Sequence, residues 1–347
     1  MKLRQREKAV SNPSAVIVLA AGQGTRMKSA TPKVLHTMCG LPLVGHAISS
    51  AYEAGAADVV VVVRYQRDRV VEVVKALDEN VLIADQDEIP GTGRAVQCGL
   101  NSLPNTLTGT VIVTSADVPL LEPETIQQLH ALHETNQNAV TVMTTIVEDA
   151  TGYGRMVRDH GALVGIVEHR DATEEQLEIK EINAGIYAFD AEFLRTALGK
   201  IDTENDQGEV YLTDTVAIAV KEGRRCGAFI LEDQWQAQGC NDRAQLAELR
   251  DEMNRRILNQ HMRAGVSIVA PCTTHIDVTV EIGPDAVIEP GTILEGDTVI
   301  EPYAVIGPNT TLRNVQVGTG AVITHSFLHD TEVTEGTVVP PFTYQNN

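Results

Sequence analysis

Apolar and polar positions come in short alternating blocks along the first 240 residues of this 347-residue chain. Apolar runs that end in polar turns predict strands at 15–20, 58–63, 81–84, 110–114, 139–147, 182–189 and 227–231. Amphipathic segments lie between several of these runs; in one of them Val44 and Ile48 share a helical face, and Gly55 is placed to end that helix. Alternating strands and helices indicate an α/β domain with a mostly parallel sheet, which binds ligands at the carboxyl ends of its strands.

The pattern changes after residue 240. Apolar residues at helical spacing first predict a connector helix, with Gly265 as its stop. From His275 onward the period is six, with aliphatic residues at Ile276, Ile282, Ile288, Leu294, Ile300, Ile306 and Leu312. Small residues follow five of them four positions later, at Ala286, Thr292, Thr298, Ala304 and Thr310. A coil that turns a corner every six residues explains this period, so we expect about three coils of a parallel β-helix with small residues at the corners, and a phase slip of one residue after Leu312.

Composition agrees with an ordinary globular protein. Apolar residues make up 43% and charged residues 21% of the chain, and the length predicts about two domains of roughly 100–200 residues. No apolar run reaches the roughly 18 residues of a membrane span. Residues 1–13 are basic and polar, so we expect a flexible tail there rather than a secretory signal. The five cysteines lack metal-ligand and redox spacing, which predicts reduced, buried thiols in a cytoplasmic protein.

The net charge of −20 is unevenly distributed. The first hundred residues hold 12 Lys and Arg against 10 Asp and Glu, a balance of +2, so the remaining 247 residues carry −22. So acidic a chain is a poor candidate for binding nucleic acid or an anionic membrane. Any anionic ligand is therefore expected at local positive groups in the N-terminal third.

The first predicted strand runs into a glycine-rich loop, Leu19-Ala20-Ala21-Gly22-Gln23-Gly24-Thr25-Arg26-Met27, followed by Pro32-Lys33. Gly22 and Gly24 allow the backbone to approach a phosphate, with the N–H groups at the start of a helix pointing at it. Gly-x-Gly alone is more often an ordinary turn, but the positive charges of Arg26 and Lys33 favour a phosphate site. The stretch is not a P-loop, which needs Gly-Lys-Ser/Thr.

This loop resembles that of the sugar-nucleotide pyrophosphorylases, and Pro32-Lys33-Val34-Leu35-His36 resembles the bacterial N-acetylglucosamine-1-phosphate uridyltransferases. Those enzymes are bifunctional and carry a glucosamine-1-phosphate acetyltransferase on a left-handed β-helix. Other matching blocks follow in family order, namely Gln86 with 91–93, then 114–120, 152–155, 166–168, 181–183, 205–214 and 241–243. The resemblance covers roughly residues 14–345.

The resemblance implies a Rossmann-like nucleotidyltransferase domain with a mostly parallel sheet, followed by a short left-handed parallel β-helix of hexapeptide repeats. The expected divisions are a tail at 1–13, the nucleotidyltransferase domain at 14–240, a connector helix at 241–264 and a truncated β-helix at 265–347. The implied reaction joins UTP and N-acetylglucosamine-1-phosphate into UDP-N-acetylglucosamine and pyrophosphate, for cell-wall (peptidoglycan) precursor synthesis. Mg²⁺ is the implied cofactor, and a cytoplasmic homotrimer through the β-helix is the implied assembly, with no nucleic-acid or membrane partner.

The resemblance also implies roles for individual residues. Arg26 and Lys33 are the expected catalytic residues, and Asp117 and Asn241 are the expected ligands of Mg²⁺. The expected substrate-binding residues are Leu19, Ala20, Ala21, Gly22, Lys33, Gln86, Gly91, Thr92, Ser115, Ala116, Asp117, Gly154, Glu168, Asn183 and Asn241. Within that set, Gln86 and the backbone at 91–92 would contact uracil. Gly154, Glu168 and Asn183 would hold the sugar.

Each of these residue types also has a structural alternative. Asp117 and Asn241 could cap the helices that follow them. Glu168 and Asn183 could lie on the solvent face of alternating strands. Tyr211 is as readily a core residue as a ligand-binding one.

The chain departs from the family pattern at several positions. Ala116 stands where a glycine is usual, Arg94 stands where a histidine is usual, and 63–65 differ from the usual Gly-His-Gly. After Tyr344 the sequence does not continue into the family's acetyltransferase residues, so we expect no acetyl transfer from this chain. The alternatives to the uridyltransferase are another sugar-1-phosphate nucleotidyltransferase, a truncated form of the bifunctional enzyme, and a non-catalytic β-helix module with a degenerate head.

Overall fold

The computed structural model describes residues 12–201 and 208–346, and the chain divides into two compact units. The first unit is Met1–His36 with Leu43–Asp242, and the second is Thr37–Pro42 with Arg243–Asn347. Most of the expected tail, and residues 205–207 of the block at 205–214, lie outside the described residues. No helix in the described part of the chain is both long and apolar enough to span a bilayer.

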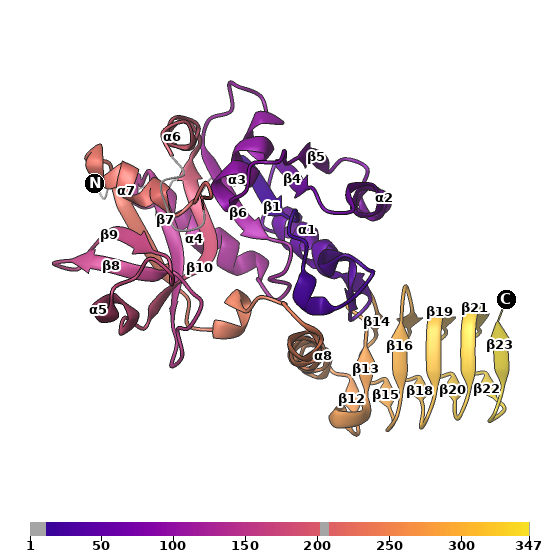
Figure 1. Ribbon diagram of the computed structural model, residues 1–347. Coiled ribbons are helices and arrows are strands. Elements are labelled where there is room, and N and C mark those ends of the chain that lie inside the picture. The colour runs from indigo at the N-terminus through magenta and orange to yellow at the C-terminus, as the bar shows by residue number, and fades with distance from the viewer. Residues whose placement is uncertain (1–11, 202–207, 347) are drawn as a thin grey trace, which may run out of the picture. The chain divides into compact units, whose positions relative to one another are not determined.

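The first unit is built on a sheet whose main path runs β11-β7-β10-β6-β1-β4-β5 (Figure 1). Its strands in chain order are β1 (Ala15–Leu19), β4 (Asp58–Val63), β5 (Leu82–Asp85), β6 (Thr110–Ser115), β7 (Val140–Ile146), β10 (Glu181–Asp190) and β11 (Cys226–Ile230). The pairs β1–β4, β1–β6, β4–β5 and β7–β11 are parallel, whereas β10 runs antiparallel to β6 and β7. The predicted α/β fold with a mostly parallel sheet is therefore confirmed.

Helices cover both faces of this sheet (Figure 1). They are α1 (Leu43–Glu53), α2 (Arg67–Leu77), α3 (Thr92–Asn101), α4 (Pro123–Asn136), α6 (Ala191–Leu198) and α7 (Asp214–Lys221). Ile17 of β1 belongs to one core cluster with Leu100 of α3 and Phe193 of α6. Its neighbour Val18 belongs to a second cluster with Val44 of α1. Because successive strand residues point to opposite faces, a strand buried on both sides reads as an unbroken apolar run, as β4 does.

A hairpin extends from the sheet next to β10. It consists of β8 (Arg155–Asp159) and β9 (Ala162–Val167), and the short helix α5 (Glu174–Leu177) follows it. The apolar-run pattern predicts no strand at β8, because Arg155, Arg158 and Asp159 interrupt the run. The hairpin bears on the site, since Gly154 precedes β8 and Glu168 follows β9.

The core of the first unit contains a buried imidazole. His133 of α4 is 3% exposed, and its Nδ1 lies 3.0 Å from the hydroxyl oxygen of Thr141. That hydroxyl accepts a hydrogen bond from Asn138, which leaves its own proton for a neutral imidazole to accept. Burial lowers the pKa of His133 from 6.5 to about 4.

This imidazole predicts a pH-dependent stability. The unfolded chain binds the proton near pH 6.5 and the folded chain only near pH 4, so the free energy of unfolding falls as the pH drops through that window. We expect a loss of roughly 2–3 kcal/mol from this group at pH 4. Chemical unfolding of the wild type and His133→Gln between pH 4 and 7 measures it, with His160→Gln, at a fully solvated position, as the matched control. Equal pH dependence in wild type and His133→Gln would contradict the assignment.

The second unit combines a long helix, a hairpin and a parallel β-helix. The helix is α8 (Arg243–Arg263), and the hairpin is β2 (Thr37–Met38) with β3 (Leu41–Pro42). One stack of the β-helix contains β12 (Ser267–Ile268), β15 (Val287–Ile288), β18 (Val305–Ile306), β20 (Val322–Ile323) and β22 (Val338–Val339). The other contains β13 (His275–Ile276), β14 (Glu281–Ile282), β16 (Ile293–Glu295), β17 (Val299–Ile300), β19 (Thr311–Val317), β21 (Phe327–Val333) and β23 (Tyr344–Asn346). The pairs within both stacks are parallel, which agrees with the predicted coil.

The six-residue period corresponds to the interior of this β-helix. The aliphatic residues of the repeat are buried, apart from the half-buried Ile282, and the small residues four positions later are fully buried. Thr292 and Thr298 donate their hydroxyls at 2.7 Å to the carbonyls of Glu289 and Glu295. A small hydroxyl-bearing residue therefore fits inside the corner and also satisfies a backbone acceptor where the chain turns.

The phase slip after Leu312 has a structural cause. Paired residues of neighbouring coils are 18 apart at Leu294–Leu312, 17 apart at Ile300–Val317 and 16 apart at Leu312–Leu328. The shorter coils coincide with β19, a seven-residue strand that pairs with both β16 and β17. One continuous strand thus replaces two short strands with a corner between them, and fewer residues complete the turn.

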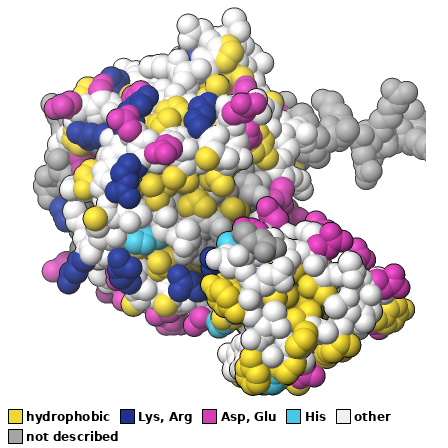
Figure 2. Space-filling model, turned by 90° about the vertical axis from the view of Figure 1, so that its right-hand side faces the viewer, with side chains coloured by type: hydrophobic (Ala, Val, Ile, Leu, Met, Phe, Trp, Pro, Cys, Tyr) yellow, Lys and Arg dark blue, Asp and Glu magenta, His cyan; other side chains and the backbone are white. Residues whose placement is uncertain are grey.

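Acidic charge is concentrated on the β-helix. Residues 265–347 contain ten Asp and Glu but a single basic residue, Arg313, a balance of −9. Figure 2 accordingly shows acidic and apolar side chains on the β-helix. The β-helix itself therefore offers few positive groups to an anionic ligand.

All five cysteines are free thiols. Cys240 is buried, whereas Cys39, Cys98 and Cys226 are half-buried, and Cys272 is exposed in the turn η4 (Pro271–Thr273). The expectation that all of them are buried is therefore wrong, because a turn outside the coil interior leaves its side chain in solvent. Burial raises the pKa of Cys226 and Cys240 to about 11, so both stay protonated near neutral pH.

Candidate active site

The glycine-rich loop after β1 folds back on Lys33. It contains the 3-10 turn η1 (Thr25–Met27), and η2 (Lys33–Leu35) comes next. Gly24 adopts a φ of 63°, and a Cβ there would lie 2.5 Å from the Cβ of Lys33, so this position requires glycine. The helix start expected after this loop is only a single three-residue 3-10 turn.

A cavity of about 840 Å³ opens at the carboxyl ends of β1, β4, β5 and β6. Ten of the expected substrate-binding residues line it, namely Leu19, Ala20, Ala21, Gly22, Lys33, Gln86, Gly91, Thr92, Ser115 and Asp117. This is the edge at which an α/β sheet is expected to bind ligands. Ala116 lies between two lining residues but is fully buried, and its N–H donates to the Leu19 carbonyl at 3.0 Å.

Four polar side chains meet beside this cavity. The Lys33 ammonium forms an ion pair with Asp117 Oδ2 and lies 3.5 Å from Asn241 Oδ1. The Arg26 guanidinium donates to the same Asn241 oxygen at 2.8 Å. A backbone hydrogen bond of 2.8 Å from the Cys240 N–H to the Asp117 carbonyl keeps the two segments together. The structure thus brings the expected catalytic pair and the expected metal-binding pair into one cluster.

Helix capping does not account for Asp117. The helix that follows it, α4, begins at Pro123 with Glu122 at its N-cap. The side chains of Lys33 and Asp117 are only 13% and 19% exposed, so their ion pair lies largely out of solvent. Asp117 is therefore held at the end of β6 as the partner of a cation and not as a cap.

The loop before α3 contains the residues expected to read a base. Gln86 Nε2 donates to the carbonyls of Ile89 at 3.1 Å and Gly91 at 3.3 Å, so its side chain closes this loop. Gly91 has a φ of 117°, and a Cβ there would lie 2.3 Å from the carbonyl oxygen of Val210. The Gly93 N–H donates to that same oxygen at 2.8 Å. The loop is therefore packed directly on the segment at 210, and only glycine fits at 91.

Arg94 holds this loop on its other side. The Nε of Arg94 lies 3.1 and 3.0 Å from the two carboxylate oxygens of Asp87, and a second guanidinium nitrogen also donates to that carboxylate. The carboxylate also accepts from the Ile89 N–H at 3.1 Å. These hydrogen bonds lower the pKa of Asp87, with the Arg94 guanidinium as the largest cause. Arg94, which stands where the family usually has a histidine, thus acts as a clamp: its hydrogen bonds to Asp87 fix the loop that contains Gln86.

The residues expected to hold a sugar form a second group. The Asn183 N–H donates to the Gly154 carbonyl at 2.9 Å, and a Cβ on Gly154 would lie 3.6 Å from both carboxylate oxygens of Glu168. Asn183 Nδ2 donates to the Tyr187 hydroxyl at 2.6 Å, and Asn183 Oδ1 accepts from the Gly185 N–H at 2.9 Å. A β-bulge in β10 between Asn183 and Tyr187 places Gly185 in the wall of the first cavity. The bulge therefore connects this group to the cavity.

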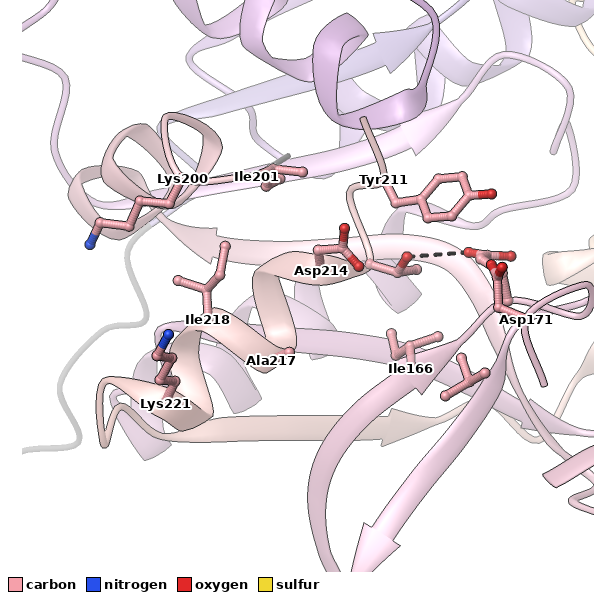
Figure 3. Close-up of a pocket in the computed structure, with 12 residues that line it drawn as sticks. Ile166, Asp171, Lys200, Ile201, Tyr211, Asp214, Ala217, Ile218 and Lys221 are labelled. Carbon is pink, nitrogen blue, oxygen red and sulfur yellow. Dashed lines mark hydrogen bonds between the residues drawn. The ribbon is translucent and has the colours of Figure 1, made fainter. Parts of the chain in front are cut away.

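Glu168 itself lines a second cavity, of about 630 Å³, between β9 and α7 (Figure 3). Thr213 Oγ1 donates to its carboxylate at 3.2 Å, the dashed line in Figure 3, and burial raises the pKa of Glu168. The solvent-face alternative does not fit a half-buried carboxylate with such a partner. Tyr211 is 8% exposed and also lines this second cavity. It is therefore a buried residue that also contributes to the cavity wall. Six of the expected site residues do not line the first cavity, namely Arg26, Ala116, Gly154, Glu168, Asn183 and Asn241.

Comparisons with known proteins agree with this arrangement. The family model for the MobA-like NTP transferase domain matches residues 16–174, and that for the bacterial transferase hexapeptide (six repeats) matches residues 279–314. The "Bifunctional protein GlmU" of Kineococcus radiotolerans is 52% identical over 332 residues, which cover 96% of this chain and 68% of that protein. The chain belongs to the GlmU family. The "Bifunctional protein GlmU" of Paenarthrobacter aurescens is 51% identical over 335 residues, covering 96% of this chain and 67% of the relative.

Membership of the GlmU family confirms the resemblance seen in the sequence. The chain is a GlmU-type nucleotidyltransferase with the uridyltransferase function of that family, and it spans about two thirds of the length of these relatives. A solved structure, described as UDP-glucose pyrophosphorylase complexed with UDP-glucose, has a TM-score of 0.53 and 19% sequence identity. The match covers 70% of this chain and 99% of that one, which shows a shared fold.

The GlmU-type cavity also contains residues to which neither the motifs nor the resemblance assigned a binding role. They are Gln23, Val34, Arg64, Tyr65, Gln66, Pro90, Ala95, Gly185 and Glu209. Arg64, Tyr65 and Gln66 directly follow β4, so the rule that ligands bind at the carboxyl ends of parallel strands could have identified them. Gly185 gives no such signal, because its place depends on the bulge in β10, whereas Glu209 lies within the matching block at 205–214.

Proposed function

We propose that this chain joins UTP and N-acetylglucosamine-1-phosphate into UDP-N-acetylglucosamine and pyrophosphate, in the supply of cell-wall precursors. The observation that carries the proposal is the cluster of Arg26, Lys33, Asp117 and Asn241 beside a cavity lined by ten of the expected substrate-binding residues. Two cationic side chains suit the phosphates of a nucleotide, and a carboxylate with an amide oxygen suits a divalent cation.

The chemistry needs mainly positioning and charge stabilisation. A phosphate oxygen of the sugar phosphate attacks the α-phosphorus of UTP in line, and the bond from that phosphorus to the pyrophosphate oxygen breaks. Arg26 and the loop N–H groups would stabilise the negative charge that develops on pyrophosphate, while Lys33 would contact the α-phosphate. The attacking phosphate is already anionic, so the reaction requires no general base from the protein.

The two expected metal ligands fit Mg²⁺. The carboxylate of Asp117 and the amide oxygen of Asn241 both face the ammonium of Lys33, so two oxygen donors already surround a cation. A Cβ at Gly239 would lie 3.8 Å from Asp117 Oδ2 and 3.7 Å from Asn241 Nδ2, so glycine keeps that side of the pair open. Mg²⁺ is commonly held by one or two carboxylates together with substrate phosphates, whose charge it neutralises when bound.

Base and sugar recognition follow from the two groups described above. Gln86 and the backbone of Gly91 and Thr92 would face uracil, because the closed loop presents amide groups at fixed positions in the cavity wall. Glu168 would accept hydrogen bonds from sugar hydroxyls, and Asn183 would donate to them or accept from them. The sugar would lie close to Gly154, where the absence of a side chain leaves room for it. The bulge of β10 would bring the sugar next to the nucleotide.

The Arg94 clamp gives a prediction about UTP affinity. Arg94→Gln removes the paired hydrogen bonds to Asp87 but touches none of the reacting groups. We expect the KM for UTP to rise about three- to tenfold with kcat near the wild-type value, because the loop must then be ordered by the nucleotide itself. Steady-state kinetics at varied UTP measures this, with Arg67→Gln, which breaks the Arg67–Asp85 ion pair outside the cavity, as the matched control. A lower kcat at unchanged KM would contradict it.

We also propose that the protein acts as a cytoplasmic homotrimer through its β-helix. Exposed apolar side chains on the β-helix, among them Phe342 at 83% and Tyr344 at 72%, support an interface between copies. The mass of the particle in solution tests this, and a monomer at micromolar concentration would contradict it.

The direct test of the function is pyrophosphate release from UTP and N-acetylglucosamine-1-phosphate, with and without Mg²⁺. We expect release only when both substrates and the metal ion are present. A panel with glucose-1-phosphate and dTTP separates this reaction from the runner-up, another sugar-1-phosphate nucleotidyltransferase. Preference for either of those substrates would overturn the choice of substrate, and no release with any of them would favour a degenerate head.

A further inference from the structure

The Lys33 side chain takes the position between the two oxygens that the proposed function assigns to a metal ion. Its ammonium pairs with Asp117 Oδ2 and lies 3.5 Å from Asn241 Oδ1. An ammonium and Mg²⁺ both seek carboxylate and amide oxygens, and two cations at such short range repel each other strongly. A metal ion can therefore reach the Asp117 carboxylate only if the ammonium of Lys33 moves away, and the Arg26 guanidinium, 2.8 Å from Asn241 Oδ1, must also yield the amide oxygen.

The fold holds Lys33 in this position by its aliphatic stem as well as by its charge. The site where a Gly24 Cβ would stand is 3.4 Å from both Cγ and Cδ of Lys33, so the glycine backbone packs along the stem. The side chain is 13% exposed and that of Asp117 is 19% exposed, so water and salt screen the pair little. A metal ion must therefore displace an interaction stronger than an ordinary surface ion pair.

We propose that Lys33 is a displaceable occupant of the metal site. In the nucleotide-free protein its ammonium neutralises Asp117 and keeps a divalent cation out. When a nucleotide enters with the cation, its phosphates give the ammonium a new anionic partner, and Lys33 leaves Asp117. The cation and the nucleotide then bind cooperatively through one side chain, because each favours the state in which Lys33 has moved. The inference rests on the proposed function for the assignment of Asp117 and Asn241 to a metal ion.

Binding of Mn²⁺ to the nucleotide-free protein, followed by the EPR signal of the free ion, tests the proposal. Lys33→Gln and Lys33→Met are expected to bind Mn²⁺ about tenfold or more tightly than the wild type, because no ammonium then competes for the Asp117 carboxylate. Lys33→Arg keeps a cation and is expected to bind as weakly as the wild type. Lys28→Gln is the matched control, because it removes a positive charge from an exposed position in the same loop.

The location of the tight binding is tested by a second substitution. Adding Asp117→Asn to Lys33→Gln is expected to abolish the gain in Mn²⁺ affinity. Unchanged or weaker Mn²⁺ binding in both Lys33→Gln and Lys33→Met would overturn the proposal, as would an equal gain in Lys28→Gln. Far-UV circular dichroism shows whether Lys33→Gln and Lys33→Met are folded. If one of them does not fold, the Mn²⁺ affinity of the other tests the proposal.

Addition of UTP provides a readout of the cooperativity. UTP is expected to increase Mn²⁺ binding more in the wild type than in Lys33→Gln, and an equal increase would overturn the proposal. None of these titrations contains a sugar phosphate, so they do not depend on turnover. If pyrophosphate release fails while Lys33→Gln binds Mn²⁺ more tightly, the proposed reaction is wrong and the role of Lys33 stands. If release occurs and Mn²⁺ binding is unchanged, the role of Lys33 alone is wrong.

Discussion

Replacing Arg26 by alanine is expected to lower kcat for pyrophosphate release by about 10³-fold, in the range that other single charge-stabilising groups contribute. Its guanidinium hydrogen-bonds to Asn241 in the cluster beside the cavity and would stabilise charge that develops on the leaving group. That charge is larger in the transition state than in bound UTP, so kcat falls more than KM rises. Steady-state kinetics with both substrates varied measures the two parameters.

Two variants serve as controls for Arg26. Arg26→Lys keeps the charge but loses the planar fork, so we expect only a partial recovery of kcat. Lys28→Ala removes a neighbouring exposed charge and is expected to leave kcat near the wild-type value. Near-wild-type turnover in Arg26→Ala would contradict the mechanism, because it would show that the reaction does not need a cationic group at this position to stabilise pyrophosphate.

The second large effect is expected at Asp117. Asp117→Asn preserves the shape of the side chain but removes the carboxylate that pairs with Lys33 and would bind Mg²⁺. We expect kcat to fall by about 10³-fold and the Mg²⁺ concentration needed for half-maximal activity to rise, since a neutral amide is a weak ligand for a hard cation. Pyrophosphate release across a range of Mg²⁺ concentrations measures both changes.

A carboxylate at another strand end provides the control for Asp117. Asp85 ends β5, but it pairs with Arg67 at the surface and does not line the cavity. Asp85→Asn is expected to keep the wild-type kcat and the wild-type Mg²⁺ dependence. If Asp117→Asn also kept them, Asp117 would be a structural partner of Lys33 and not a metal ligand. Thermal unfolding of both variants separates a lost ion pair from lost catalysis.

The resemblance predicted most of the site residues, and a simple rule of the first unit explains why they lie together. Leu19, Ser115 and Asp117 stand at the ends of apolar runs, and apolar runs of this length become parallel strands. The carboxyl ends of such strands meet at one edge, so residues far apart in sequence line one cavity. Arg64 stands at the same edge after β4, and the rule would have identified it too.

Other parts of the site have no local signal. The antiparallel insertion of β10 and its bulge decide where Asn183 and Gly185 lie, and a change of strand direction does not alter the apolar pattern of the strand itself. The loop at 91 needs glycine because of a carbonyl at Val210, which is 119 residues further along the chain. The helix start expected in the loop is only a single 3-10 turn after Gly24, and the loop packs on Lys33.

The sequence by itself determined the main strands of the first unit, the connector helix and the β-helix, and its resemblance indicated the family of chemistry. The six-residue period specified a β-helix and its interior, because the side chains of each coil repeat the same environment. Only the tertiary structure decided that Lys33, Asp117 and Asn241 share one cluster, with the ammonium between two oxygens. The physical reason is that periodicity reports which side chains are buried, whereas a charged cluster depends on which distant segments pack together.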